Sequence, residues 1–337
     1  SSDTNLKYSQ IIQDLKNKVY HPIYLLYGEE EFFIDQISDF IEHKVLDEAE
    51  KEFNLSVLYG LETDVLSLIS AAKRFPMMAS YNVIIVKEAQ SLSGIGELAT
   101  YVKNPSPTTI LVLNHKHKKP DGRSEFMKLM KKQGVCFESK TLYENQVVSW
   151  IEEYLKAKGF TISPKSAQLI VENLGNSLSK ITNELDKLTI SISGTSHIED
   201  KHIEENIGIS KDYNVFELNN ALGNRDVLKA NTIINHFGKN PQDFPPAATL
   251  PMVYNFFSKV LLYHTVAKEA NNIKASKLGV NPFFLKDYAV AARNYSVKKI
   301  ARIISSLRKA DTRSKGIGNV ETEAQDLYKE LVFEILH

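Results

Sequence analysis

The sequence predicts an α/β protein in which a doubly wound parallel sheet opens the chain, followed by a small helical domain and an all-α domain. In residues 1–142, short runs rich in β-forming residues alternate with helical patterns, which is typical of a parallel sheet with helices on both faces. The β signal fades after residue 142, and from residue 212 the pattern is helical to the end. We therefore expect three domains, residues 1–142, 143–211 and 212–337, as 337 residues would allow.

The first domain is expected to contain five short strands, each bounded by turn residues or by a helical pattern. These strands are residues 23–27, 54–59, 82–86, 108–113 and 135–137. After the first strand, one helical stripe is formed by Phe33, Ile37, Phe40, Ile41 and Val45.

Two further helices complete the first domain. Thr63 and Asp64 are good starting residues for a helix that should end at Phe75, because the residue before Pro76 is disfavoured in helical conformation. Asp121-Gly122 is expected to begin the other, which runs to Gly134.

The rest of the chain is predicted to be helical. In the second domain, Gly159 and Gly175 are stop signals and Pro164 suits a helix start, so helices are expected at 147–158, 164–173 and 177–190. In the third domain, breaks are expected at 238–246, 278–282 and 315–318.

Composition excludes several classes of protein. Lys plus Arg and Asp plus Glu both total 41, so net charge favours neither a general nucleic-acid coat nor an acidic disordered chain. The single Cys136 lies in an apolar run, which indicates a buried thiol in a reducing compartment, without intrachain disulfides or a Cys-rich metal site. No apolar stretch approaches the roughly 20 residues that span a bilayer, and no signal peptide is evident. A cytoplasmic location is expected.

Residues 24–33 run from an apolar strand through Gly28 into a helix, as in a phosphate-binding loop, but the loop lacks the Lys and the Ser or Thr that hold phosphate and magnesium. Glu29, Glu30 and Glu31 stand there instead, where each suits the helix dipole by roughly 0.3 to 1 kcal/mol and repels a triphosphate. A plain turn between strand and helix is the alternative. We expect no nucleotide, cofactor or metal, and no catalytic constellation is evident.

The connection at residues 74–81 carries large apolar side chains where turn residues are usual. Phe75, Pro76, Met77 and Met78 suit an adaptable plug for an apolar pocket on a partner, because methionine is flexible and polarizable. In the alternative interpretation, the two methionines cap the core of their own domain.

Two segments are locally basic. The run 115–119, with two His and three Lys, suits a solvated loop or contacts with phosphates better than a metal site. From Arg293 to Lys315 there are eight basic residues and one acidic residue, which suits a nucleic-acid backbone, an acidic subunit or an ordinary solvated face. In the helix expected at 297–310, the buried stripe is predicted to be Val297, Ile300, Ala301, Ile304 and Leu307, and the projecting cations are Lys298, Arg302 and Lys309, with Arg313 beyond the helix.

Taken in order, several of these motifs resemble a known family, the delta subunit of the bacterial replicative DNA polymerase clamp loader. The resemblance rests on residues 22–30, on Phe53-Asn54-Leu55 leading to Gly60, and on residues 71–78 before the strand at 83–87. It continues through residues 183–188 and 310–316, and so covers nearly the whole chain.

The resemblance implies an AAA+ type first domain, a lid domain and a collar domain that assembles with sister subunits. It implies a subunit of the DNA polymerase III holoenzyme that is itself non-catalytic, acts in DNA replication, and binds and helps to open the sliding clamp (the beta subunit). The implied partners are the ATPase subunits, the delta-prime subunit and primed DNA. The clamp contact falls on Met77 and Met78, flanked by Phe75 and Pro76, where a Leu-Phe pair is familiar in the family. Two alternatives stay open at this point: an atypical NTPase, and a stand-alone DNA-binding module that uses residues 293–315.

Overall fold

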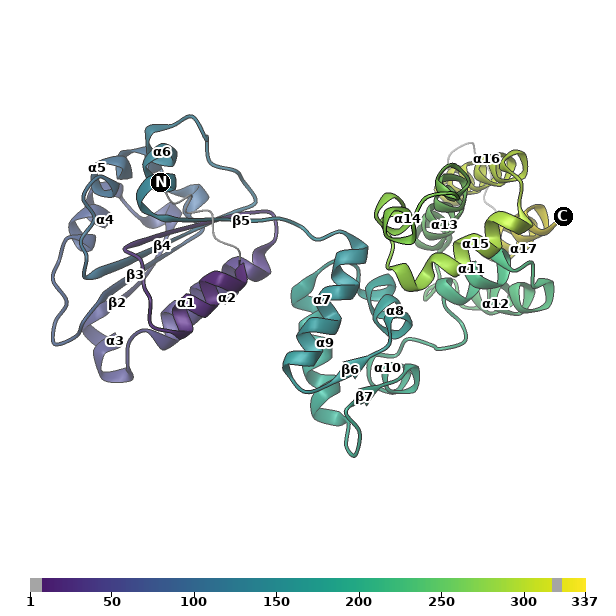
Figure 1. Ribbon diagram of the computed structural model, residues 1–337, viewed down its shortest axis with the longest axis horizontal. Helices are drawn as coiled ribbons and strands as arrows, with labels where there is room; N and C mark the ends of the chain where they lie inside the picture. The colour runs from purple at the N-terminus through teal and green to yellow at the C-terminus, as the bar shows by residue number, and fades with distance from the viewer. Residues whose placement is uncertain (1–7, 317–322) are drawn as a thin grey trace. The chain divides into compact units, whose positions relative to one another are not determined.

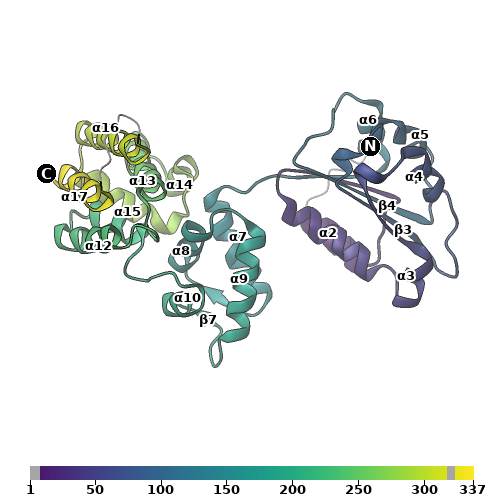
Figure 2. The same cartoon turned by 180° about the vertical axis from the view of Figure 1, so that it is seen from behind.

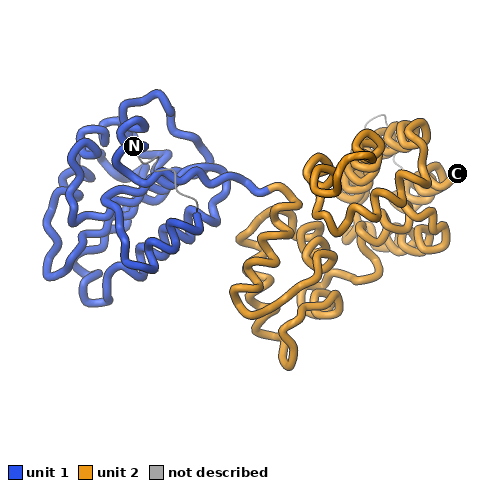
Figure 3. The backbone as a smooth tube through the Cα atoms, in the orientation of Figure 1, with its two compact units in different colours: residues 1–142 blue, residues 143–337 orange. Residues whose placement is uncertain are grey.

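The computed structural model describes residues 8–316 and 323–337, drawn from two sides in Figures 1 and 2. The chain divides into two compact units, one up to Leu142 and the other from Tyr143 onward (Figure 3). The expected break at 315–318 falls partly outside the described residues, while the expected boundary between lid and collar at residue 211 stays a prediction. Within the described ranges, no helix is both long and apolar enough to cross a bilayer.

The first unit is built on a five-stranded parallel sheet, which confirms the predicted α/β class. The strands lie in the order β2-β3-β4-β1-β5. Their bounds are β1 Ile23–Gly28, β2 Leu55–Tyr59, β3 Asn82–Lys87, β4 Thr109–Lys116 and β5 Val135–Ser139. β4 extends three residues beyond its predicted end because it stays paired with β1 as far as Gly28 and Lys116.

Helices cover both faces of this sheet, as a doubly wound arrangement requires. Figure 1 shows α1 (Tyr8–Lys16) and α2 (Glu31–Lys44) on one face and α4 (Val65–Ala72), α5 (Ala99–Val102) and α6 (Glu125–Gln133) on the other. Alternate strand residues such as Leu25, Ile84 and Leu111 join the core beneath α4 to α6. Phe33, Ile37 and Ile41 of the predicted stripe are buried on α2, while Phe40 and Val45 are half-buried.

The predicted bounds of two helices were wrong. α4 ends at Ala72, three residues before Phe75, because side chains from neighbouring strands bind its last carbonyls: Asn82 Nδ2 lies 3.1 Å from the Ala71 oxygen and Thr109 Oγ1 lies 2.7 Å from the Ala72 oxygen. α6 begins after Ser124, whose hydroxyl accepts a bond from the Met127 N–H, and not at Asp121-Gly122.

Some short elements were not predicted. α3 (Glu48–Asn54) is a short, mostly polar helix whose start is stabilised by a capping box of Asp47 and Glu50. The 3-10 turns η1 (Gly60–Glu62), η2 (Ala89–Ser91) and η3 (Ile95–Leu98) are too short to show a periodic pattern.

The second unit begins with four helices and a two-stranded parallel ribbon. Its helices are α7 (Glu144–Ala157), α8 (Pro164–Leu174), α9 (Leu178–Ser191) and α10 (Asp200–Ile207). The ribbon, β6 (Thr161–Ile162) with β7 (His197–Ile198), and α10 were not predicted, because two-residue strands and a helix whose one buried side chain is Ile203 carry little periodic signal.

The remaining helices pack around one large apolar core that includes Phe237, Phe257 and Tyr328. They are α11 (Val215–Gly223), α12 (Val227–Lys239), α13 (Pro246–Val266), α14 (Asn271–Leu278), η4 (Pro282–Phe284), α15 (Leu285–Asn294), α16 (Val297–Ser314) and α17 (Ala324–Leu336).

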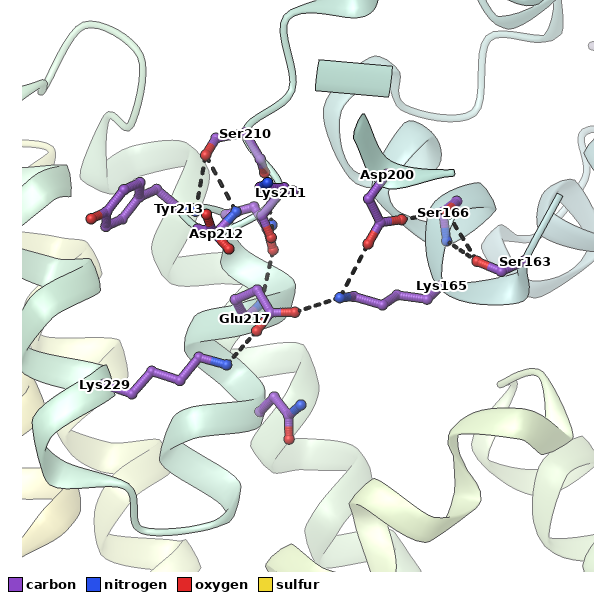
Figure 4. A network of polar contacts seen from close by, with 12 residues as sticks. Ser163, Lys165, Ser166, Asp200, Ser210, Lys211, Asp212, Tyr213, Glu217 and Lys229 are labelled. Carbon is purple, nitrogen blue, oxygen red and sulfur yellow. Dashed lines mark hydrogen bonds and ion pairs between the residues drawn. The ribbon is translucent and has the colours of Figure 1, made fainter. Parts of the chain in front are cut away.

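A buried carboxylate ties α8 to α11 and α12 within the second unit. Figure 4 shows Lys165 of α8 between Asp200, at 3.3 Å, and Glu217 of α11, at 2.9 Å, while Lys229 of α12 contacts the other oxygen of Glu217. The Glu217 side chain is only 9% exposed. Burial raises the pKa of Glu217, but Lys229 and Lys165 outweigh burial and bring the pKa below its usual value.

We expect Glu217→Gln to lower the free energy of unfolding by about 1 to 3 kcal/mol at neutral pH, because the two lysines then lose their shared anion. Since the pKa of Glu217 is lowered in the folded state, its contribution is present above the ordinary Glu value of 4.5 and is lost as the pH falls through the lower folded value. Thermal unfolding of both proteins across this pH range checks the expectation. Glu184→Gln, which breaks the surface pair with Lys187, should leave the midpoint nearly unchanged, and equal losses in the two variants would contradict it.

Candidate functional site

The segment between α4 and β3 exposes large apolar side chains on the first unit. Phe75 is 85% exposed, Met77 61% and Met78 101%, while Pro76 is half-buried. These values do not fit the interpretation in which the methionines cap the core of their own domain. We call residues 75–78 the apolar loop.

Asn54, the last residue of α3, holds the apolar loop in place. Its side-chain oxygen accepts a hydrogen bond from the Met77 N–H at 2.6 Å, and its Nδ2 donates to the Met77 carbonyl at 2.9 Å. The same Nδ2 also donates to the Glu50 carbonyl at 2.9 Å, and Asn54 is only 2% exposed. A buried amide therefore fixes both backbone groups of one exposed methionine.

Met78 adopts a backbone conformation that is unusual for its residue type. Its φ is 51°, in the left-handed region that a side chain with a Cβ atom rarely enters. A conformation of this kind costs roughly 1 to 3 kcal/mol and persists where the surrounding structure enforces it. Here it turns the chain directly after the residue held by Asn54 and leaves the Met78 side chain fully in solvent.

Sequence reasoning did not identify Asn54 as a functional residue. It lies within the Phe53-Asn54-Leu55 motif, and Phe53 beside it is itself 63% exposed. The signal that could have found Asn54 is an amide at the junction of a helix and an edge strand, but its hydrogen-bond partner lies 23 residues away. The sequence alone does not show that residues so far apart along the chain are in contact.

Gly28, at the end of β1, has a structural role unrelated to phosphate. Its φ is 130°, and a Cβ atom there would lie 2.1 Å from the carbonyl oxygen of Ser139. Ser139, at the end of β5, accepts a bond from the Glu30 N–H at 3.2 Å and donates its hydroxyl to the Glu30 carbonyl at 2.5 Å. Glycine is thus required for the approach of β5 to the turn.

Protein groups already occupy the start of α2, where a phosphate-binding loop presents its free N–H donors. Glu30 accepts the Phe32 N–H at 3.0 Å. Burial raises the pKa of Glu30, the bond from Phe32 opposes this, and Glu31 raises the pKa further. Glu31 pairs with His117 at 2.5 Å and Lys116 at 3.8 Å, so these two carboxylates serve the fold. Glu29 is exposed at the turn itself.

The basic run 115–119 is only partly the solvated loop of one interpretation, because residues 117–119 form an exposed loop at the end of β4 while the first two residues are part of the strand. His115 and Lys116 belong to β4, and burial lowers the pKa of His115. Lys116 lies 2.8 Å from Asp35, and Lys119 lies 3.0 Å from Glu138. Acidic partners therefore neutralise Lys116 and Lys119, whereas Lys118 is exposed and forms no ion pair among the described residues.

The basic helix α16 differs from its predicted orientation. The buried residues are Ile300, Ile303, Leu307 and Ala310, whereas Val297 is 51% exposed and Ala301 is exposed. The stripe is rotated because α16 packs against both α13 and α17.

The predicted cations of α16 fall into two groups. Lys298, Arg302 and Lys309 are exposed on one helical face, and among the described residues they form no ion pair. Arg313 instead contacts both carboxylate oxygens of Glu330 on α17 at 2.9 Å. Only the first three therefore present free charge.

Across residues 8–316 and 323–337, no group of three or more His, Cys, Asp and Glu side chains has the arrangement of a metal site. Cys136 is buried in the sheet, and burial raises its pKa to about 11, so it remains a neutral thiol.

Comparison with known proteins adds to this geometry. Residues 24–140 match the model of the family described as DNA polymerase III, delta subunit. The DNA polymerase III subunit delta of Bacillus subtilis is 29% identical over 316 residues, which cover 90% of each chain. The solved structure of the Bacillus subtilis DNA clamp loader delta protein aligns with 98% of this chain and 99% of its own, with a TM-score of 0.56 and 26% identity.

Proposed function

Because the chain belongs to the family of DNA polymerase III delta subunits, we propose that it is a non-catalytic clamp-loader subunit that binds the sliding clamp through residues 75–78. A subunit of this family is one component of a multi-subunit clamp loader. We propose four specific properties: the clamp contact, the opening of the clamp ring, the lack of nucleotide hydrolysis and the identity of the partners.

The observation that carries the proposal is an exposed apolar loop held by a buried hydrogen-bonded side chain. Met77 and Met78 lie in solvent, where exposed apolar groups are costly unless a partner covers them. Asn54 fixes the Met77 backbone, so less conformational entropy is lost when the loop inserts into a pocket. An ordered apolar anchor is what a clamp-binding element requires.

Ring opening follows from differential binding. A subunit that binds the clamp more tightly when one ring interface is sprung shifts the ring toward that state by the difference in binding free energy, and by no more. The chain needs no chemical step of its own for this, and the ATPase subunits would decide when the loop is accessible.

The proposal assigns no nucleotide hydrolysis to this chain. Glu29, Glu30 and Glu31 place negative charge where a triphosphate would lie, and the Phe32 N–H is already engaged by Glu30. β3 ends at Lys87 and is followed by Glu88, where a hydrolase would place acidic residues for magnesium, and Lys87 lies 3.4 Å from Glu42. An atypical NTPase is therefore the less favoured alternative.

We propose that different parts of the chain contact different partners. Residues 212–337 would assemble with the ATPase subunits and the delta-prime subunit, and primed DNA would enter the assembled complex. Lys298, Arg302 and Lys309 are free to meet DNA phosphates or an acidic subunit, while Arg313 is engaged by Glu330. With a net charge of zero, a stand-alone DNA-binding module is the weakest alternative.

The test is binding of the purified chain to its sliding clamp in the absence of nucleotide, with a parallel thermal-shift measurement in Mg-ATP. We expect saturable clamp binding that Mg-ATP does not change, and no shift of the Tm by Mg-ATP, because ligands that bind the folded state raise the Tm. Absence of clamp binding together with a clear Mg-ATP shift would replace the proposal with the NTPase alternative.

A further inference from the structure

A cavity of about 100 Å³ lies inside the second unit, where α7 and α8 meet α11, α13 and α15. Its walls combine aromatic rings with several carboxyl and amide groups. The polar groups that matter for its chemistry are Glu144, Glu172, Asn219, Lys259, Asp287 and Tyr288.

Two oxygen atoms of this cavity have no hydrogen-bond partner among the described residues. Glu172 Oε2 and Asn219 Oδ1 are closed to solvent and have no hydrogen-bond partner among the described residues. Gln168 donates to Glu144 at 2.7 Å, but its contact with Glu172 Oε1 is a long 3.4 Å. Buried oxygens without partners are rare in folded proteins, and each indicates either a proton on the oxygen itself or a missing donor.

The charges around the cavity favour a cation as that donor. Three carboxyl groups, Glu144, Glu172 and Asp287, face one lysine, Lys259, whose Nζ makes only a 3.4 Å bond to the Gly279 carbonyl. No ion pair within 4.0 Å joins Lys259 to any of these carboxylates in the described part of the chain. The rings of Phe256 and Tyr288 complete the wall, and aromatic faces attract cations.

We propose that this cavity binds a guanidinium or primary ammonium group, which donates to the unpartnered Glu172 and Asn219 oxygens. The group would come from a free small cation or from an Arg or Lys side chain of a sister subunit. Glu172 is the anion that the ligand meets, and Lys259 is the built-in cation that competes with it.

The protonation of Glu172 makes binding depend on pH. Burial, then the neighbouring Glu144 carboxylate, raises the pKa of Glu172 to about 8, although hydrogen bonding from the Gln168 side chain and from the Phe216 backbone opposes the rise. Burial lowers the pKa of Lys259 and raises that of Asp287, and the Tyr288 phenol stays neutral because burial raises its pKa. The other charged groups around Glu172 are Glu144 on α7 and Glu217 on α11. Without a ligand Glu172 is thus mainly protonated at neutral pH, and a bound cation would displace the proton.

The experiment titrates the isolated 337-residue chain with methylguanidinium chloride and with methylammonium chloride, and NMR signals of residues around the cavity monitor binding. Tetramethylammonium chloride is the control, because it carries the same charge without N–H donors. We expect saturable binding of at least one of the first two, weaker binding of the control, and affinity that falls by up to tenfold per pH unit below about 8.

Two nearly isosteric variants should move the affinity in opposite directions. Glu172→Gln should weaken binding by about 10- to 100-fold, because a charged hydrogen bond is lost, and it should remove the pH dependence. Lys259→Met should strengthen binding, because the competing cation is gone. Absence of saturable binding, binding equal to that of tetramethylammonium, or an affinity unaffected by Glu172→Gln would each overturn the proposal.

The assembled clamp loader distinguishes the two sources of the cation. If a sister subunit supplies the side chain, methylguanidinium binds the isolated chain but not the complex, and Glu172→Gln weakens assembly. If the natural ligand is a free small cation, binding persists in the complex and assembly is unchanged.

Discussion

Replacing Met77 and Met78 together by alanine is expected to weaken clamp binding by roughly 30- to 1,000-fold, the loss of about 2 to 4 kcal/mol that a central apolar anchor supplies. Folding should be nearly unaffected, because the two side chains are 61% and 101% exposed and support no core. Titration of clamp against wild type and the double variant gives the binding change, and thermal unfolding gives the stability.

A second test variant and a control variant separate loss of the clamp contact from general effects on folding or surface hydrophobicity. Met78→Gly removes the side chain at a φ of 51°, which glycine adopts without strain, so binding should fall while the Tm stays close to that of the wild type. Ile190→Ala combined with Leu228→Ala removes two side chains of the second unit that are 85% and 80% exposed, and should leave clamp binding intact. Residues 77 and 78 are not the clamp contact if the double methionine variant binds like the wild type. The same conclusion follows if the Ile190 and Leu228 control variant binds as weakly as the double methionine variant.

The strands could be predicted from the sequence because each is short and rich in β-forming residues, and all except the edge strand β2 are largely buried on both faces. Leu25, Ile84 and Leu111 on one face alternate with Tyr24, Ile85 and Val112 on the other, and all are buried. Such runs leave a clear local signal. Helix ends were less predictable because distant side chains decide them: Asn82 and Thr109 end α4 at Ala72, although Pro76 suggested Phe75.

The apolar loop could be singled out from the sequence, but the side chain that holds it in place could not. Large apolar residues in a connection are a local anomaly, so Phe75 to Met78 stand out in the sequence. What orders them is not local, since Asn54 reaches Met77 from a different element. Likewise, Gly28 suggested a degraded phosphate loop, but the contact that requires glycine is with Ser139 at the end of another strand. The cavity beside Glu172 depends on five helices, and no motif indicates it.

Asn54→Ala is expected to weaken clamp binding by roughly tenfold or more and to destabilise the first unit by about 2 to 4 kcal/mol, because three hydrogen bonds of a buried side chain are lost at about 1 kcal/mol each. The methionines remain in this variant, so any loss of binding measures the value of holding the Met77 backbone in place. Amide hydrogen exchange of residues 77–79 should speed up, and clamp titration gives the affinity.

Asn82→Ala is the matched control, because it removes one 3.1 Å bond to the Ala71 carbonyl at the base of the same connection without touching Met77. It should cost about 1 kcal/mol of stability and bind the clamp nearly as the wild type does. If Asn54→Ala speeds exchange at residues 77–79 yet binds the clamp with wild-type affinity, the loop recognises its partner without being pre-ordered, and the two methionines act as flexible anchors. If both affinity and protection fall in Asn54→Ala alone, the buried amide is part of the clamp-binding element, because the order that it imposes on Met77 is then a measurable share of the binding free energy.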